Sequence, residues 1–251
     1  MSEYLSSEAV VLKSQDYKED DKIITIFGEK TGKLRAVVKG VKKSNSKLRG
    51  AVQGFSVTDL TFTKGKVMPI VIAGEVVKSF NGAADDYTKV NYACILSEFV
   101  DKAMPEGEID ETIYELLKRG IRIISENNPW SGCMGILLRI IDHLGYAAEY
   151  QACVFCGRDL AAEENVYYHA DGLACAKCAQ ASGEMCSELS RESGSVLRAL
   201  QSISTEQLGQ VYASTRAQVQ IEHYIELQLG NILDYPLKSW EIHKNFPKCQ
   251  E

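Results

Sequence analysis

The chain has 251 residues, of which 45% are hydrophobic and 25% are charged. This length allows one large domain or two smaller ones, and this composition is typical of an ordinary globular protein. The start, MSEYLSSEAVVLK, holds no apolar core of signal-peptide length, and no apolar run is long enough to span a bilayer. We therefore expect a cytoplasmic protein with no membrane partner. Eight cysteines fit a reducing compartment of that kind.

The net charge of −6 hides two regions of opposite sign. Residues 1–80 contain 14 lysines and arginines against 9 acids, a net charge of +5, whereas residues 81–251 contain 14 against 25, a net charge of −11. The average alone would argue against a nucleic-acid partner, but the first region is basic enough to attract one. We therefore expect two domains, at 1–80 and 81–251, and assign DNA binding to the first.

Residues 1–80 are predicted to form short β-strands, because they are rich in valine, isoleucine, threonine and phenylalanine and are punctuated by glycine turns. The expected strands lie at 10–12, 22–27, 33–39, 56–62 and 66–77. Five or six such strands fit a small closed barrel such as the oligonucleotide-binding OB-fold, with an SH3-like barrel as the alternative. Pro69 falls in the last strand region, so we expect that strand to be bulged, broken or at an edge.

Residues 30–49, the basic segment, hold eight positive charges and no acid. Such a composition favours phosphate binding, and its polar part predicts a mobile loop. A solvated basic loop with no ligand is the alternative. The spacing of the phenylalanines fits a barrel core at least as well as a base-stacking platform, so we expect contacts to the DNA backbone with little sequence specificity. The candidate DNA-binding residues, Lys42 and Lys43 foremost, are Lys33, Arg35, Lys39, Lys42, Lys43, Lys47 and Arg49.

From residue 81 the apolar pattern becomes helical. Asp110 is the expected N-cap of a second helix, Pro129 begins a third, and Gly145 is the expected C-cap of that helix. The core of the last long helix is expected to contain Val219, Tyr224, Ile225 and Leu229. The helical stretches are 86–104, 112–126, 129–145, 190–203 and 214–233.

A zinc site is predicted from two Cys-x2-Cys pairs separated by eighteen residues, formed by Cys153, Cys156, Cys175 and Cys178. Two such knuckles can hold Zn²⁺ in a tetrahedron, and four cysteine ligands leave no open position for substrate, so the metal would be structural. Redox thiols, or a site that has lost or exchanged its metal, are the alternatives. His169 and Cys186 lie close enough in sequence to replace a ligand. We expect this zinc module, at about 150–186, to be inserted in the helical domain.

The order of these features resembles RecO, the family of bacterial recombination-mediator and DNA-repair proteins. The resemblance rests on EAVVLKSQDYKEDDKIITIFGEKTGKLRAVVKGVKKSNS, on LLRIIDHLGY followed by both cysteine pairs, and on LGNILDYPLKS, and it spans essentially the whole chain. Two departures accompany it. A longer tail, WEIHKNFPKCQE, replaces the short end that is usual in the family. Zinc ligands are not kept in every member, so the four cysteines would stabilise the protein without being essential to its activity.

The resemblance implies an α+β protein with an N-terminal OB-fold barrel and a helical domain that carries the zinc insertion. It implies binding of single- and double-stranded DNA and annealing of complementary strands. It also implies work with a RecR-type partner to load RecA onto strands coated by single-stranded-DNA-binding protein, whose C-terminal tail docks on the helical part. These partners place the protein at the bacterial nucleoid.

An enzyme is not expected, because the four histidines form no H-E-x-x-H motif and the chain has no G-x-S-x-G, no G-x-G-x-x-G and no complete P-loop. An active site assembled only in three dimensions stays open as an alternative. A zinc-containing, sequence-specific DNA-binding regulator is the other alternative. It would need basic residues on a recognition helix, whereas the basic residues here lie on the expected barrel.

Overall fold

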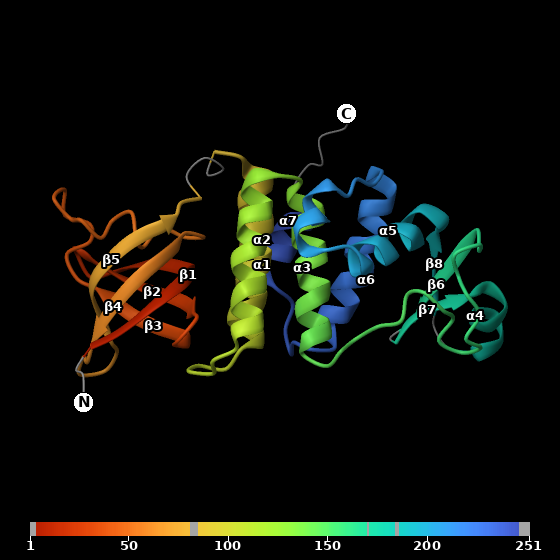
Figure 1. Ribbon diagram of the computed structural model, residues 1–251, viewed down its shortest axis with the longest axis horizontal. Helices are drawn as coiled ribbons and strands as arrows, with labels where there is room; N and C mark the ends of the chain where they lie inside the picture. Colours follow the sequence, from red (N-terminus) through yellow and green to blue (C-terminus); the bar gives the residue numbers. More distant parts are fainter. Residues whose placement is uncertain (1–3, 81–84, 170, 184–185, 246–251) are drawn as a thin grey trace. The chain divides into compact units, whose positions relative to one another are not determined.

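The computed structural model of the protein describes residues 4–80, 85–169, 171–183 and 186–245 (Figure 1). Strands come first and helices follow, so the predicted α+β class is confirmed. The chain forms two compact units, one from Met1–Glu126 with Leu237–Glu251 and the other from Asn127–Pro236. The first unit thus combines the strands of the N-terminal region with three helices. The functional boundary expected at residue 80 stays a prediction.

The N-terminal strands close into a barrel in the order β1-β2-β3-β5-β4, and β1 pairs with β4 to complete the ring (Figure 1). All neighbouring strands are antiparallel except β3 and β5, which are parallel. A five-stranded barrel is the form of the OB-fold, which is therefore the fold of this region. The strands are β1 (Tyr4–Tyr17), β2 (Asp21–Gly28), β3 (Gly32–Val38), β4 (Val57–Thr63) and β5 (Ile70–Lys78).

Alternation along the strands separates the barrel core from its outer surface. On β3, Ala36 and Val38 belong to the core, whereas Arg35 is exposed. Pro69 has no backbone N–H, and β5 begins directly after it. The pairing of β4 with β5 is also irregular near Phe62, so the predicted break and bulge are both present.

Two helices of the first unit follow the barrel, α1 (Tyr87–Ala103) and α2 (Glu111–Glu126). The side chain of Asp86 accepts hydrogen bonds from two backbone N–H groups in the first turn of α1. Asp110 does the same for α2 through the backbone N–H of Ile113, at 2.9 Å. Short polar side chains at these positions satisfy N–H groups that have no partner within the helix, and the N-cap predicted at Asp110 is confirmed.

Glu8 of β1 joins the barrel to α2. Its Oε1 accepts hydrogen bonds from the hydroxyl of Tyr114 and from Nζ of Lys118, both at 2.6 Å. Burial opposes ionisation of Glu8, but these two partners outweigh it and lower the pKa of the carboxyl below its ordinary value. The contact fixes the outer face of β1 against the helix.

The third helix of the first unit, α7 (Lys238–Asn245), was not predicted, and it includes the start of the tail to which no role was assigned. Its N-terminus is capped by Glu98 of α1, which accepts hydrogen bonds from the backbone N–H and hydroxyl of Ser239 at 2.8 and 2.6 Å. Near its other end, Nδ1 of His243 lies 2.8 Å from the side-chain amide of Asn91. The remainder of the tail, 246–251, lies outside the described residues.

The second unit contains the remaining helices and a small three-stranded sheet. The predicted third helix begins at Pro129, and Gly145, with φ of +92°, ends it in a left-handed conformation. One core residue was predicted wrongly: Val219 on α6 is 47% exposed, because the buried stripe passes through neighbouring positions of that helix. The elements are α3 (Pro129–His143), β6 (Asn165–His169), β7 (Gly172–Cys175), α4 (Ala176–Ser182), β8 (Ser187–Ser190), α5 (Arg191–Ser202), η2 (Thr205–Gln210) and α6 (Thr215–Gly230).

Within the described ranges, no helix is both long enough and apolar enough to cross a membrane.

Candidate nucleic-acid interface and metal centre

The basic segment runs along β3 and into the long connection between β3 and β4. This connection is better anchored than the mobile loop that its composition predicted. Val41, Ala51 and Val52 insert into the barrel core. The backbone N–H of Gly40 also donates to Oδ1 of Asp21 at 2.8 Å, which ties the start of the connection to the end of the β1–β2 turn. The backbone that carries the lysines of this connection is therefore anchored to the barrel.

Acidic side chains from other parts of the first unit meet several of these cations. Asp16 lies 3.2 Å from Nζ of Lys42, and Asp20 lies 3.7 Å from Nζ of Lys43. Both pairs are exposed, and exposed pairs contribute only about 0–1 kcal/mol, so a phosphate could replace either acid. Lys42 and Lys43 are nevertheless not the bare charges that the acid-free sequence indicated.

Lys33 and Arg49 serve the architecture. Nζ of Lys33 donates to the backbone carbonyl of Asp101 on α1 at 2.6 Å and lies 3.7 Å from the carboxylate of the same residue. The guanidinium of Arg49 donates to the carbonyls of Lys42 and Lys43 at 3.2 and 2.6 Å, which holds the loop in its curved form. Both side chains are already engaged before any ligand arrives.

Arg35, Lys39 and Lys47 differ from the other candidates. All three are exposed, and among the described residues none of them has an ion-pair partner. Free cations on a rigid barrel can contact phosphates without first breaking an internal pair. Of the seven predicted DNA-binding residues, these three are the most available.

The four predicted cysteines come together in the second unit. Their sulfur atoms all lie within 4.8 Å of one another. Cys153 and Cys156 form a knuckle closed by Gly157, whose N–H donates to the carbonyl of Cys153 at 2.8 Å and whose φ is +70°. The other pair straddles the junction of a strand and a helix, since Cys175 ends β7 and Cys178 lies in the first turn of α4.

This cluster fits a metal ion. Sulfur ligands about 2.3 Å from Zn²⁺ in a tetrahedron lie about 3.8 Å from one another. The sulfurs of Cys156 and Cys175 lie 4.0 Å apart, close to that value. Burial opposes ionisation of Cys153, but backbone N–H groups, that of Cys175 first, lower the pKa of its thiol to about 6. A thiolate poised in this way is the form that binds a metal.

The two possible substitute ligands lie outside the cluster. Neither His169 nor Cys186 belongs to it, and His169 instead has its Nδ1 3.2 Å from the backbone N–H of Asp171. All seven cysteines of the described part of the chain are free thiols, so disulfides play no part there.

Gly172, with φ of +139°, stands directly against the backbone of Glu149, where any Cβ would overlap it. Only glycine allows the hairpin of β6 and β7 to approach the backbone of Glu149 this closely.

Fold and sites together define an α+β protein in which a small barrel with a cationic loop precedes helices that carry a four-thiol cluster. Comparison with known proteins gives the particular family. The profile described as "Recombination protein O N terminal" matches residues 1–80, and the one described as "Recombination protein O C terminal" matches residues 84–241. The chain therefore belongs to the RecO family.

Curated relatives agree with this assignment. DNA repair protein RecO of Syntrophomonas wolfei is 34% identical over 232 residues, which are 89% of each chain. The protein of the same name from Clostridium perfringens is 27% identical over 252 residues, covering 98% of this chain and 96% of its own. That from Moorella thermoacetica is 33% identical over 174 residues, or 68% of this chain and 65% of its own.

Family membership settles the broad role. The protein acts in DNA repair and recombination as a mediator and not as an enzyme. No bond-breaking step therefore has to be assigned to the site.

Proposed function

We propose that the protein binds single- and double-stranded DNA without sequence specificity and anneals complementary strands. The observation that carries this proposal is the set of unpaired cations, Arg35, Lys39 and Lys47, on the barrel of a recombination-family protein. Lysines and arginines that meet phosphates release condensed counterions, which supplies affinity for any sequence. Lys42 and Lys43 add to this surface when phosphate replaces Asp16 and Asp20.

Annealing follows from the same chemistry. Two complementary strands are polyanions that repel each other, and a cationic surface that holds both reduces this repulsion. Holding both also raises the local concentration of each strand for the other. Base pairing then proceeds without any covalent step, and most bases stay available because the main contacts are to the DNA backbone.

We assign a structural Zn²⁺ ion to the four-cysteine cluster. Cys153, Cys156, Cys175 and Cys178 would all be ligands, and their proximity supports this assignment. With four thiolates the coordination shell is closed, so the ion would take no substrate. Its contribution would be to fold the short strands and the helix α4 around it, since so small a module buries little apolar surface of its own.

The acidic remainder of the chain is assigned to protein partners. Residues 81–251 carry a net charge of −11, which repels DNA and leaves the barrel as its site. With a RecR-type partner, the protein would load RecA onto DNA coated by single-stranded-DNA-binding protein, whose C-terminal tail would dock on the helical part. This work would take place in the cytoplasm, at the nucleoid.

Equilibrium binding tests the proposal against a sequence-specific regulator. Fluorescence anisotropy would be measured with two unrelated single strands and two unrelated duplexes of equal length, each at 50 and 200 mM salt. We expect similar affinities within each pair and a steep loss of affinity at the higher salt. A duplex preferred by a thousandfold or more over its unrelated counterpart would indicate the regulator instead.

A further inference from the structure

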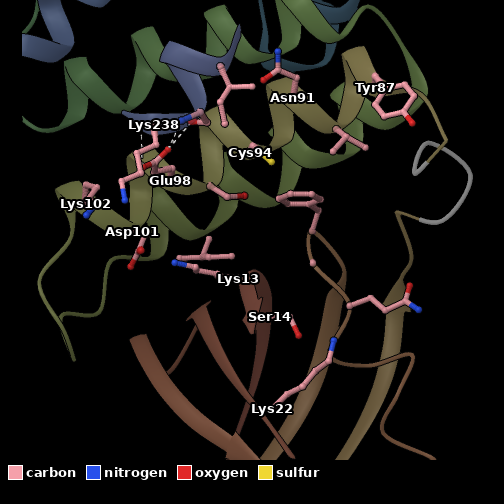
Figure 2. Close-up of a pocket in the computed structure, with 18 residues that line it drawn as sticks. Lys13, Ser14, Lys22, Tyr87, Asn91, Cys94, Glu98, Asp101, Lys102 and Lys238 are labelled. Carbon is pink, nitrogen blue, oxygen red and sulfur yellow. Dashed lines mark hydrogen bonds between the residues drawn. The ribbon is translucent and has the colours of Figure 1, made fainter. Parts of the chain in front are cut away.

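A cavity of the first unit lies where the barrel meets α1 and α7, and no role has yet been assigned to it. Its volume is about 760 Å³, within the range of pockets that bind drug-sized ligands. Figure 2 shows Lys13, Ser14 and Lys22 on the barrel side and Tyr87, Asn91, Cys94 and Glu98 along α1. The lining also includes residues 53–55 of the connection between β3 and β4.

The free charge around this cavity is positive. Its two acids are already engaged, because Glu98 caps α7 and Asp101 lies 3.7 Å from Nζ of Lys33. In contrast, Lys13 and Lys238 are exposed, and neither has an ion-pair partner within the described ranges. An apolar cavity with a cationic rim favours an occupant that is apolar in part and negatively charged in part.

Two residues that line the cavity carry hydroxyl groups without partners. Oγ of Ser97 and Oγ of Ser14 are both buried, and neither has a hydrogen-bond partner among the described residues. Ser97 as a whole is only 2% exposed. Buried hydroxyls are almost always hydrogen-bonded, so these two are exceptions beside the cavity, but their oxygens are closed off from it.

Aromatic rings also line the cavity. Phe62 belongs to the barrel core and Phe27 is fully buried, but Phe55 is half-buried and faces this cavity. Its φ of +66° is a left-handed conformation that bulky residues rarely adopt, and such outliers concentrate at functional sites. Tyr87 stands at the rim and is 76% exposed.

The cavity lies next to a hollow of the basic segment. A second hollow, of about 340 Å³, is lined by Lys42 and Arg49 of the basic segment. Lys22 and Gln53 line both this hollow and the large cavity. A strand whose phosphates lie on the loop would therefore reach the cavity without leaving the protein surface.

We propose that this cavity receives unstacked bases of single-stranded DNA. The bases would stack on Phe55 and Tyr87, and the adjoining phosphates would lie near the free lysines. The proposal rests on the proposed DNA-binding function and deepens it by separating single strands from duplexes. An acidic peptide would also suit the charge, but the adjacent hollow of the basic segment and the two aromatic side chains favour a nucleic acid.

The test compares Tyr87→Ala with Tyr235→Ala, because both tyrosines are highly exposed, at 76% and 81%, and only Tyr87 lines the cavity. Phe55→Leu is a second variant that removes the ring but keeps an apolar side chain. Affinities for an oligothymidine strand and for a duplex of equal length would be measured by anisotropy. Urea unfolding of each variant would confirm that the fold is retained.

We expect Tyr87→Ala and Phe55→Leu to lose single-strand affinity by about fivefold or more, as removal of a base-stacking ring does, with duplex affinity unchanged. Tyr235→Ala should match the wild type on both. Equal losses on single strands and duplexes would overturn the cavity assignment, as would no loss at all. Variants that keep single-strand affinity but lose binding of an acidic peptide would assign the cavity to a protein partner. Failure of the wild type to bind any DNA would refute the proposed function itself.

Discussion

Replacing both Lys39 and Lys47 with alanine should weaken DNA binding in a way that salt reveals. Both lysines are exposed, and within the described part of the chain neither has an ion-pair partner, so each is free to contact one phosphate. For single strands, each lost phosphate contact makes the negative slope of log K against log salt shallower by about 0.7. The slope of the double variant should therefore be shallower than that of the wild type by about 1.4. The defect measured at 50 mM salt should then shrink by about sevenfold at 200 mM.

The assay is anisotropy of a labelled single strand titrated at four salt concentrations. Lys64→Ala/Lys66→Ala is the matched control, because it removes the same charge from exposed lysines of the barrel that lie outside the basic segment. Its slope should remain close to that of the wild type. If both double variants lose the same slope, net charge alone explains binding, and the assignment of phosphate contacts to the loop is refuted.

Three further predictions concern stability. Glu98→Ala removes the cap of α7, including the hydrogen bonds from Ser239, and should lower the free energy of unfolding by about 1–2 kcal/mol in urea; an unchanged midpoint would contradict the cap. The pKa of Glu8 in the folded protein lies below its ordinary value of 4.5. The ionised carboxyl therefore stabilises the fold above pH 4.5, and this stabilisation is lost as the pH falls through the folded pKa. Glu8→Gln should destabilise the protein at about pH 7 and progressively less toward about pH 3. A difference that is independent of pH would refute this linkage. The purified protein should contain one zinc per chain by metal analysis, and a chelator should lower its melting temperature. The Cys175→Ser variant should contain no metal, whereas the Cys186→Ser variant should retain it. A Cys175→Ser protein that lacks the metal but is as stable as the wild type would argue against a structural ion.

Local patterns predicted the parts of the fold that local chemistry determines. The strands followed from β-branched residues and glycine turns, and the start of α2 followed from Asp110, whose side chain caps its own first turn. The spacing of the cysteine pairs was sufficient to bring the four thiols together, because each knuckle is a local structure. The metal itself remains a proposal.

Features that depend on distant residues could not be predicted. The cap of α7 comes from Glu98, about 140 residues earlier, so the short helix carried no strong signal of its own. The sequence around Lys42 contains no acid, and its partner Asp16 lies in β1, far from it along the chain. The cavity beside Phe55 exists only where the barrel meets its helices, and an unpaired Ser97 cannot be recognised before the fold is known.

Strand annealing tests the central claim most directly. Two complementary strands, first bare and then coated with single-stranded-DNA-binding protein, would be mixed with the wild type, with Lys39→Ala/Lys47→Ala and with the Lys64→Ala/Lys66→Ala control. We expect salt-sensitive annealing of both substrates by the wild type and the control, and slower annealing by the loop variant. A wild-type protein that does not accelerate annealing even of bare strands would contradict the proposed function.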